Sequence, residues 1–303
     1  MNILITGGAG FIGKYLIKFL LEKNYNITVL DNFSNSTKNS LTIKNNKLKI
    51  INGDITKKQD VLNAIKNQDV VIHLAAKISV TESIKNPMET FKVNVDGTKN
   101  ILSACRINNI KKLIVSSSAA VYGEGFENIK LNENSETNPI SPYGASKIEM
   151  EKEIKKFNLE SKMNCIILRF FNLYGIGQSE EYAGVITKFL KKIKENKPIE
   201  IFGDGMQTRD FIAIEDVINA IHISILKNKT GTYNIASGNI FQLKDIANLM
   251  IAVSGKKLSI KFLDEKKGDI RFSNADITLA RKELGYEPKI ELKNGIKELI
   301  KNF

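Results

Sequence analysis

Short apolar runs alternate with amphipathic stretches through the first half of the chain. Between the runs, apolar positions recur with helical spacing over 10–23, 57–66, 82–107 and 142–161. Several runs are apolar at consecutive positions, which is typical of parallel strands covered by helices on both faces. This alternation predicts right-handed βαβ units and a Rossmann-like, doubly wound α/β fold. The predicted strands are 2–6, 27–30, 48–51, 70–74, 112–117 and 165–171.

The pattern changes after Tyr174, where a loop is expected over 174–183. Further elements follow as helix 184–195, strand 199–202, a strand and helix over 211–226, strands near 232–235 and 259–262, and helices near 242–252, 276–284 and 292–302. We expect a first domain over 1–173, to which 211–236 returns. Residues 174–210 and 237–303 are expected to form a smaller α/β domain interleaved with it.

Composition narrows the functional classes. The 303 residues are 42% hydrophobic, enough for a sizeable core, and carry a net charge of +12. The excess is almost entirely lysine, since arginine occurs only at 106, 169, 209, 271 and 281. These lysines are spread over expected helix surfaces and do not cluster with aromatic residues. The pattern therefore favours a solvated surface over a nucleic-acid groove.

Cysteine and histidine are scarce. Cys105 and Cys165 each lie in an apolar segment, which favours reduced core thiols in a cytoplasmic protein. With His73 and His222 as the only histidines, a metal site of nitrogen and sulfur ligands is not expected. No apolar run approaches the ~20 residues that cross a bilayer, and no leader pattern precedes the first strand. We expect a cytoplasmic protein without a membrane or nucleic-acid partner.

The first strand is followed by ITGGAGFIG, with Gly7, Gly10 and Gly13 before a helix. Missing Cβ atoms let the backbone approach a pyrophosphate, and the helix N-terminus offers free N–H groups. Asp31 ends the second strand, where a carboxylate accepts from both ribose hydroxyls and repels a 2′-phosphate. The combination predicts NAD rather than NADP; the alternative is a structural turn and an ordinary loop aspartate.

Further residues at strand ends fit the same groove. Asp54 in NGDI is expected to accept from the adenine amino group. In HLAA, Ala75 and Ala76 place small side chains where the backbone has to pass close to the cofactor. We interpret His73, in the same run, as a satisfied core histidine rather than a catalytic one.

Tyr143 and Lys147 in SPYGASK are four residues apart at the start of an expected helix, so they share one face. A free tyrosine has a pKa of about 10 and is a poor base at neutral pH. A lysine ammonium beside it and a positive nicotinamide ring both favour the phenolate and lower that pKa. Downstream of a dinucleotide fold, the pair predicts a general base.

These motifs closely resemble the extended short-chain dehydrogenase/reductase family, and within it the sugar-nucleotide 4-epimerases of the UDP-glucose/UDP-galactose type. The similarity runs nearly end to end, through TGGAGFIG, HLAA, NVDGT, SSSAAVYG, SPYGASK, LRFFNLYG, GDGMQTRDF and GDIRFSNAD. The resemblance implies that Tyr143 is the general base and that Ser118 hydrogen-bonds the sugar 4-hydroxyl. It also implies that Lys147 binds the nicotinamide ribose and tunes Tyr143.

The resemblance implies the remaining contacts as well. Cofactor contacts that it adds are Phe11, Ile12, Asn32, Ile55, Leu74, Asn94, Ser116 and Phe170. Substrate contacts, besides Ser118 and Tyr143, are expected at Ser79, Asn172, Gly184, Val185, Phe202, Arg209, Lys266, Asp269 and Ser273. Asn172 and the backbone near Gly184 and Val185 would meet the diphosphate, and Asp269 would accept from the ribose.

Two of these contacts have plain alternatives. Phe202 would lie against uracil, or it is an ordinary core residue of its strand. Arg209 would pair with phosphate through its planar fork, or it is a surface partner of Asp210.

The residues after Ser118 indicate the reaction class. Related 4,6-dehydratases carry an Asp-Glu pair there and UDP-xylose synthases a glutamate, because those reactions need proton transfer near C5 and C6. Here the positions are Ala119 and Ala120, which cannot transfer a proton. The resemblance therefore implies chemistry limited to C4: a transient 4-keto sugar turns within the site and is reduced on its other face. Most binding energy then has to come from the UDP.

Three positions modify the expected specificity. Ser273 aligns with the gate residue beside the sugar C2 substituent, and a small residue there leaves room for an N-acetyl group. We therefore expect UDP-GlcNAc and UDP-GalNAc to be accepted alongside UDP-Glc and UDP-Gal. Lys266 stands where relatives usually carry arginine, and it keeps the charge without the fork. Ala213 stands where an aromatic residue or histidine is common, with no assigned consequence.

The resulting hypothesis is an NAD-dependent UDP-hexose 4-epimerase, with 1–173 as the NAD-binding domain and the interleaved domain holding the UDP-sugar. Related enzymes form homodimers through the helices corresponding to 82–107 and 142–161. A UDP-glucuronate 4-epimerase is one alternative, although no dedicated cluster for its carboxylate is identified. Asp31 argues against an NADPH-consuming reductase. Intact Ser118, Tyr143 and Lys147 argue against a noncatalytic NAD- or RNA-binding relative.

Overall fold

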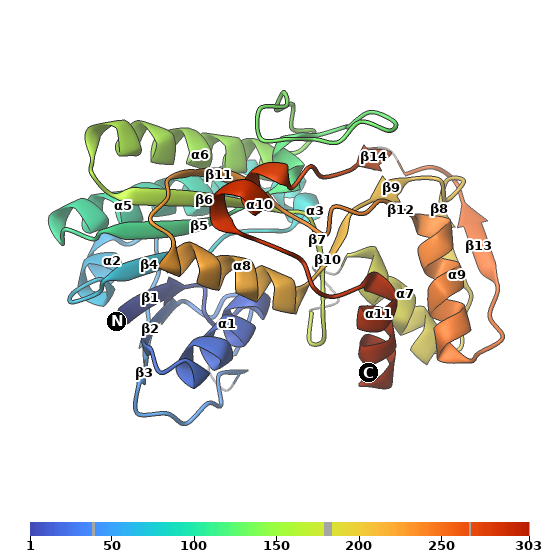
Figure 1. Cartoon of the computed structure of the whole chain (residues 1–303), viewed down its shortest axis with the longest axis horizontal. Helices are drawn as coiled ribbons and strands as arrows, with labels where there is room; N and C mark the ends of the chain where they lie inside the picture. The colour runs from blue at the N-terminus through green and yellow to red at the C-terminus, as the bar shows by residue number, and fades with distance from the viewer. Residues whose placement is uncertain (38–39, 179–183, 267, 303) are drawn as a thin grey trace.

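A seven-stranded parallel sheet forms the centre of the computed structural model, which describes residues 1–37, 40–178, 184–266 and 268–302 (Figure 1). Its strand order is β11-β6-β5-β4-β1-β2-β3. The strands are β1 (Asn2–Thr6), β2 (Asn26–Asp31), β3 (Leu48–Asn52), β4 (Val70–His73), β5 (Lys112–Ser118), β6 (Asn164–Phe170) and β11 (Gly231–Ile235). The predicted doubly wound fold is confirmed. The order reverses between β1 and β4, and ligands of open parallel sheets bind at the carboxyl ends of such strands.

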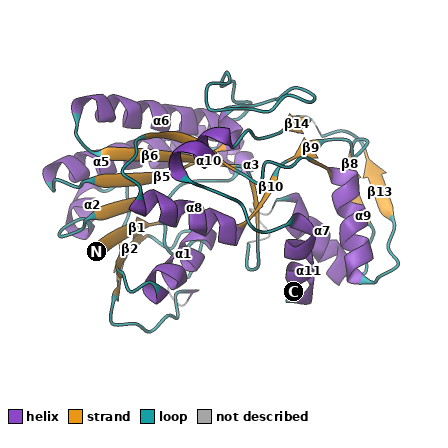
Figure 2. Ribbon diagram, in the orientation of Figure 1, coloured by secondary structure: helices purple, strands orange, loops and turns teal. Residues whose placement is uncertain are grey.

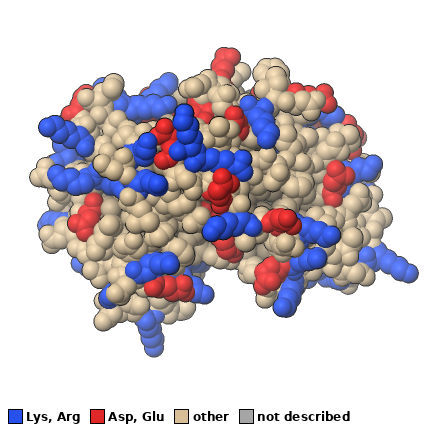
Figure 3. Space-filling model, viewed as in Figure 1, with Lys and Arg blue, Asp and Glu red and all other residues tan. Residues whose placement is uncertain are grey.

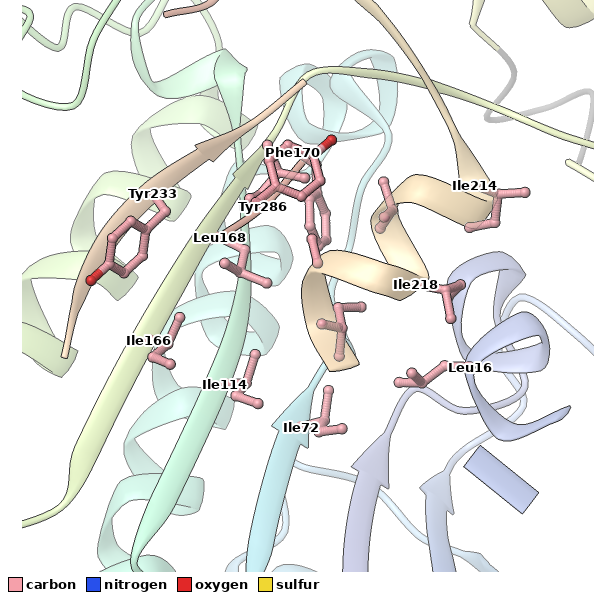
Figure 4. Packing of buried hydrophobic residues seen from close by; sticks show 14 of the residues in the cluster. Leu16, Ile72, Ile114, Ile166, Leu168, Phe170, Ile214, Ile218, Tyr233 and Tyr286 are labelled. Atoms are coloured by element: carbon pink, nitrogen blue, oxygen red, sulfur yellow. The ribbon is translucent and has the colours of Figure 1, made fainter. Parts of the chain in front are cut away.

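Helices cover both faces of this sheet. On one face lie α2 (Lys58–Ala64), α5 (Gly97–Ile107) and α6 (Pro142–Glu160), which share a buried apolar cluster with the strands. The other face carries α1 (Phe11–Glu22), α8 (Ile214–Leu226) and α10 (Thr278–Leu284). Figure 4 shows Leu16 of α1 and Ile218 of α8 over the face that carries Ile72 and Ile114. Two-sided burial explains why these strands are apolar at consecutive positions.

A third apolar cluster lies beyond the sheet, on the right of Figure 1. It is built from α7 (Val185–Lys194), α9 (Leu243–Ser254) and α11 (Leu292–Lys301), together with the parallel pair β8 (Ile199–Phe202) and β13 (Ile260–Leu263). These elements match the predicted ones closely. Of the loop predicted over 174–183, residues 179–183 lie outside the described residues.

Very short strands connect the two parts (Figure 2). β7 (Asn172–Tyr174) pairs with β10 (Phe211–Ala213), and β9 (Thr208–Arg209) lies between β12 (Phe241–Gln242) and β14 (Phe272–Ser273). Of these strands, only β10 falls in a predicted strand. None of the pairings was expected from the sequence. Two or three residues are too few to show a period of two.

The single helix predicted over 82–107 is wrong. The chain forms α3 (Val80–Lys85), α4 (Pro87–Phe91), a π-helical turn (Lys92–Asp96) and then α5. Asn86, with φ −131° and ψ 67°, breaks the helix before Pro87. Proline lacks a backbone N–H and disfavours helical geometry in the residue before it, which explains the break.

The surface charge is dispersed on the face drawn in Figure 3, where Lys and Arg side chains are interspersed with Asp and Glu. Several ion pairs join residues three apart on one helix, such as Lys85–Glu82 and Lys152–Glu149. Within the described ranges, no helix is long and apolar enough to cross a bilayer. Cys105 and Cys165 are buried free thiols, as predicted, and burial raises the pKa of Cys165 to about 12.

Helix α6 begins unusually close to the end of β5. Ser141 caps it by accepting a hydrogen bond from the Gly144 backbone N–H at 3.1 Å, and Pro142 occupies the first turn, where its missing N–H costs nothing. A Cβ atom on Gly144 would lie 2.4 Å from the carbonyl oxygen of Ala120. Glycine therefore sets how near α6 comes to the segment after Ser118.

Replacing Gly144 with alanine tests this close approach. We expect a net destabilisation of about 1–2 kcal/mol, because overpacking against a backbone carbonyl outweighs the roughly 1 kcal/mol that alanine gains over glycine in a helix. Urea denaturation of G144A and the wild type measures the difference. The control K152A alters an exposed position of the same helix and should stay within about 0.5 kcal/mol of the wild type. A G144A protein as stable as the wild type contradicts the expectation.

Candidate active site

A cavity of about 530 Å³ opens at the carboxyl ends of the strands, where the sheet order reverses. It brings together most of the predicted site residues. Those lining it are Gly7, Gly10, Phe11, Ile12, Gly13, Asp31, Asn32, Asp54, Ile55, Leu74, Ala75, Ala76, Ser116, Ser118, Tyr143, Lys147, Phe170, Asn172, Gly184 and Val185.

The turn after β1 is a cradle of bare backbone. Gly7 has φ +71°, and a Cβ atom there would lie 2.6 Å from the backbone nitrogen of Ala75. Helix α1 starts at Phe11, and its N-cap residue Gly10 has no side chain, so the first N–H groups of the helix have no side-chain cap. Oxygen atoms of the Asp31 carboxylate accept from the N–H groups of Ala9 at 2.9 Å and Phe33 at 2.8 Å. Close backbone, an uncapped helix end and this carboxylate together fit a dinucleotide.

Asp54 is kept as an ionised acceptor at the β3 side of the cavity. Asn32 donates to its Oδ2 at 2.9 Å, and both the backbone N–H and the hydroxyl of Thr56 donate to its Oδ1 at 2.8 Å. Burial acts to raise the pKa of Asp54, but these hydrogen bonds outweigh it and hold the pKa below its usual value.

Tyr143, Lys147 and Ser118 line the same cavity, and Tyr143 is hydrogen-bonded with Ser118. The Lys147 Nζ donates to the Ser116 carbonyl at 2.9 Å and lies 6.0 Å from the centroid of the Tyr143 ring. Burial lowers the pKa of Lys147 to about 8, although the Glu151 carboxylate acts to raise it. Burial also raises the pKa of Tyr143, opposed by its hydrogen bond with Ser118.

The sequence predicts a lowered pKa for Tyr143, but the residues of the protein alone do not produce it. Burial of the hydroxyl raises this pKa, and the Lys147 ammonium donates to the Ser116 carbonyl instead of to Tyr143.

The segment after Ser118 carries no acid into the cavity. Ser118 ends β5 and its Oγ accepts from the Ala120 N–H at 3.1 Å, which caps a short 3-10 turn over Ala119–Val121. Among the residues that the structure describes, the acidic side chains lining the cavity are Asp31, Asp54 and Glu89, on β2, after β3 and on α4.

Two predicted contacts lie beside the cavity. Asn94 is buried in the π-helical turn, where its side chain accepts from the Lys77 N–H at 2.8 Å and donates to the Lys77 carbonyl at 3.0 Å. It also donates to the Ser146 hydroxyl, so it orders the chain after β4 rather than lining the cavity. Ser79 caps α3 and lines an adjacent cavity of about 160 Å³, which shares Asn35, Lys77, Ile78 and Glu89 with the larger one.

The other predicted substrate contacts, Phe202, Arg209, Lys266, Asp269 and Ser273, also lie outside the cavity lining. Phe202 and Lys266 are exposed, at the end of β8 and in the segment after β13, whereas Ser273 is buried on β14 beside Arg209. Arg209 donates to the Asp269 carboxylate at 3.1 Å.

The alternative pairing of Arg209 with Asp210 is wrong. Asp210 instead accepts from the backbone N–H groups of Ser237 and Gly238 and from the Ser237 hydroxyl. Ala213, the other departure from relatives, packs in the third apolar cluster next to β7.

Several cavity residues were missed. Most of them lie near the carboxyl end of a strand, in the loop after it or on a nearby helix. They include Asn35, Lys77, Ile78, Glu89, Val93, Ser117, Phe171, Leu173, Tyr174, Gln178, Ile186 and Phe211. Ligands of parallel sheets bind at the carboxyl ends of the strands. Extending the search a few residues beyond each strand end would therefore have found Asn35 after β2 and Lys77 after β4.

His73, at the end of β4, is a buried and neutral residue next to the site. Thr98 donates its hydroxyl proton to the Asn94 carbonyl at 2.6 Å, so at 3.0 Å it accepts from the His73 Nε2. The Nδ1 then accepts from the Thr6 hydroxyl at 2.7 Å. Burial, reinforced by the charge of Lys147, lowers the pKa of His73 to about 3.

The comparisons with known proteins agree with this geometry. A model of the NAD dependent epimerase/dehydratase family matches residues 3–236. A protein of Methanocaldococcus jannaschii, provisionally named a UDP-glucose 4-epimerase, is 40% identical over 304 residues, which cover 98% of this chain and 97% of that protein.

Two solved structures are similar over nearly the whole chain. The UDP-N-acetylglucosamine 4-epimerase of Methanobrevibacter ruminantium, in complex with UDP-N-acetylmuramic acid, has a TM-score of 0.94 and 34% identity, covering 99% of this chain and 97% of that one. The UDP-glucose 4-epimerase of Thermotoga maritima, with UDP-glucose, has a TM-score of 0.94 and 31% identity, covering 99% and 98%.

The neutral state of His73 predicts a loss of stability in acid. The unfolded chain binds a proton at His73 below about pH 6.5, while the folded protein resists it down to a pKa of about 3, so stability falls as the pH falls. This group should contribute a slope of about 1.4 kcal/mol per pH unit in that window.

Urea unfolding of the wild type and H73Q at several pH values measures this slope. H73Q should be less stable at neutral pH because it loses the threonine hydrogen bonds, and the gap should narrow as the pH falls. H222Q is the control, since His222 is only partly buried. Parallel stability curves for the wild type and H73Q would contradict this role.

Proposed function

The chain belongs to the NAD dependent epimerase/dehydratase family, and on that premise we propose that it catalyses the NAD-dependent 4-epimerisation of a UDP-hexose. UDP-glucose and UDP-galactose are the proposed substrates, together with their N-acetylated counterparts UDP-GlcNAc and UDP-GalNAc. One observation carries the proposal: Tyr143, Lys147 and Ser118 line one cavity, and the two residues after Ser118 are alanines.

The chain's own residues can hold the cofactor and handle the proton. NAD, when bound, supplies a reversible hydride acceptor. The Gly7 cradle and the start of α1 suit its pyrophosphate, and Asp31 suits its adenosine ribose. Tyr143 takes the proton of the sugar 4-hydroxyl and later returns it, while Ser118 hydrogen-bonds the same oxygen.

The charge of Lys147 favours the phenolate form of Tyr143. Because Ala119 and Ala120 cannot transfer a proton, the sugar is not pushed on to elimination or decarboxylation. The 4-keto sugar can only be reduced again, on either face.

The UDP is proposed to be held where the third apolar cluster meets the sheet. Asn172, Gly184 and Val185 line the cavity on that side and would contact the diphosphate. Arg209 already forms an ion pair with Asp269, so a phosphate would replace that carboxylate on a guanidinium whose planar fork suits its oxygens. Phe202 and Lys266 remain proposed contacts of the nucleotide. The sugar has to turn during the reaction, so most binding energy would come from these UDP contacts.

The arrangement of the three apolar clusters supports the proposed division of the chain. The two clusters on the sheet draw mainly on residues 1–173 and 211–236, proposed as the NAD-binding domain. The third draws largely on 174–210 and 237–303, proposed as the UDP-sugar domain. We also propose a homodimer that pairs through the segments 82–107 and 142–161, on the basis of the sequence resemblance.

Replacing Tyr143 with phenylalanine removes the proposed base and keeps the ring. Interconversion should fall by about 10²–10⁴-fold, while bound NAD stays at the wild-type level because the cradle is untouched. Product analysis after incubation with UDP-Glc, UDP-Gal, UDP-GlcNAc, UDP-GalNAc or UDP-glucuronate measures this, and Y25F is the matched control outside the cavity.

Two product patterns would contradict the proposal. Loss of water or carbon dioxide from the sugar nucleotide would point to dehydratase or decarboxylase chemistry. Turnover of UDP-glucuronate alone would favour the glucuronate epimerase.

Ser273 should govern the choice between plain and N-acetylated sugars. A tyrosine there is expected to crowd the C2 substituent at a cost of about 1–3 kcal/mol, which lowers kcat/KM for UDP-GlcNAc by roughly 5–150-fold. The kcat/KM for UDP-Glc should change far less, and S273A should leave both values near those of the wild type. If S273Y keeps the wild-type ratio between the two substrates, Ser273 is not the gate.

A further inference from the structure

Three consecutive serines at the end of β5 each interact with a different residue of α6. The Ser116 carbonyl accepts from the Lys147 Nζ at 2.9 Å, and Ser118 hydrogen-bonds Tyr143. Between them, the Ser117 hydroxyl donates to the Glu151 Oε1 at 2.6 Å. Positions 143, 147 and 151 follow at intervals of four and therefore share one helix face. Glu151 is thus the next residue in line after the proposed base and its lysine.

Glu151 is a buried carboxylate with a fixed orientation. Arg169 on β6 donates from Nε to its Oε1 at 2.9 Å and from Nη2 to its Oε2 at 2.6 Å, a two-pronged pairing that fixes both oxygens. Each side chain of this pair is 3% exposed. On the outer side, the Lys155 ammonium lies 3.7 Å from Oε2.

Arg169 is itself held from behind. Its Nη1 donates to the Tyr122 hydroxyl at 2.9 Å, and that hydroxyl donates to Asn234 on β11 at 2.6 Å. The guanidinium also lies 4.8 Å from the centre of the Tyr122 ring. Glu151 is therefore part of a chain of contacts that reaches across three strands.

We propose that Glu151, held by Arg169 and Ser117, is a positioning residue that keeps Lys147 charged beside the reaction centre. The inference rests on the proposed function, because the charge of Lys147 matters there only if Tyr143 acts as the base. A buried ammonium loses its proton readily unless an opposite charge lies nearby.

The surroundings of Lys147 supply that opposite charge from one direction. The groups facing it are Tyr143, the Met150 sulfur at 4.0 Å and Glu151 on α6, the Ser116 carbonyl on β5 and the neutral His73 on β4. Of these, Glu151 is the group that carries a negative charge, and it acts against the lowering of the Lys147 pKa by burial. Without Glu151, Lys147 would be left with uncharged neighbours.

The Glu151–Arg169 pair could instead serve only to hold α6 against the sheet. The pH profile of kcat distinguishes this structural role from the proposed effect on Lys147. We compare E151Q and the double variant E151Q/R169Q with E149Q, whose substitution lies on a half-exposed part of the same helix. The double variant leaves no unpaired buried charge, so it guards against a folding defect in E151Q. The readout is kcat between about pH 6 and pH 10, with a UDP-sugar that the wild type turns over.

We expect the alkaline limb of kcat to move to lower pH by about one unit in E151Q, which is about a tenfold loss of kcat on that limb, with a smaller loss at acid pH. The double variant should shift in the same direction, but less, because no unpaired Arg169 repels Lys147. E149Q should follow the wild type at every pH.

Each other outcome decides against the inference or against its premise. A uniform loss of kcat with an unchanged alkaline limb assigns the pair a clamping role only and overturns the inference. Failure of both E151Q and the double variant to fold does the same. A wild-type protein that interconverts no UDP-sugar overturns the proposed function instead, before any variant is compared.

Discussion

Helix α6 approaches the end of β5 so closely that one glycine has no room for a side chain and two opposite charges meet in the interior. Burying Glu151 and Arg169 is costly in desolvation, and such pairs are often replaceable by apolar residues without loss of stability. Their position indicates that the pair fixes the register between helix α6 and the strands β5 and β6. That register puts Tyr143 beside Ser118 and directs Lys147 toward the cavity.

The cofactor end of the cavity is organised by a different constraint. Parallel strands end at one edge, and the turns after β1 and β4 come so near each other that a Cβ atom on Gly7 would collide with the backbone of Ala75. A surface made of main chain offers N–H groups at fixed positions, which suits a phosphate better than mobile side chains do. The two carboxylates at this end, Asp31 and Asp54, are held by hydrogen bonds from their own loops.

Much of the fold and the inner site could be predicted because local patterns specify them. Buried parallel strands appear as apolar runs, and the glycine turn and the Tyr143–Lys147 spacing each lie within a few residues of sequence. The break at Asn86 was missed although Pro87 marks it, because the flanking segments share a helical period. The short strands β9, β12 and β14 leave no period to detect.

Contacts between distant segments could not be predicted. Glu151 resembles a solvated helix charge in the sequence, and only the fold brings it to Arg169, eighteen residues later. The hydrogen bonds between Asn94 and Lys77, seventeen residues apart, likewise become visible only in the fold.

If Arg209 is the proposed phosphate contact, its pairing with Asp269 has a consequence for which anions can bind there. Arg209 is almost enclosed and already carries a carboxylate partner, so the protein supplies its own rival to any incoming anion. A singly charged solute such as chloride or acetate would merely exchange one weak partner for another and gain little. An anion with two adjoining charged groups could occupy the guanidinium while offering a further charge to its neighbours. Competition from Asp269 would therefore disfavour binding of small monovalent anions at Arg209 and favour polyvalent ones.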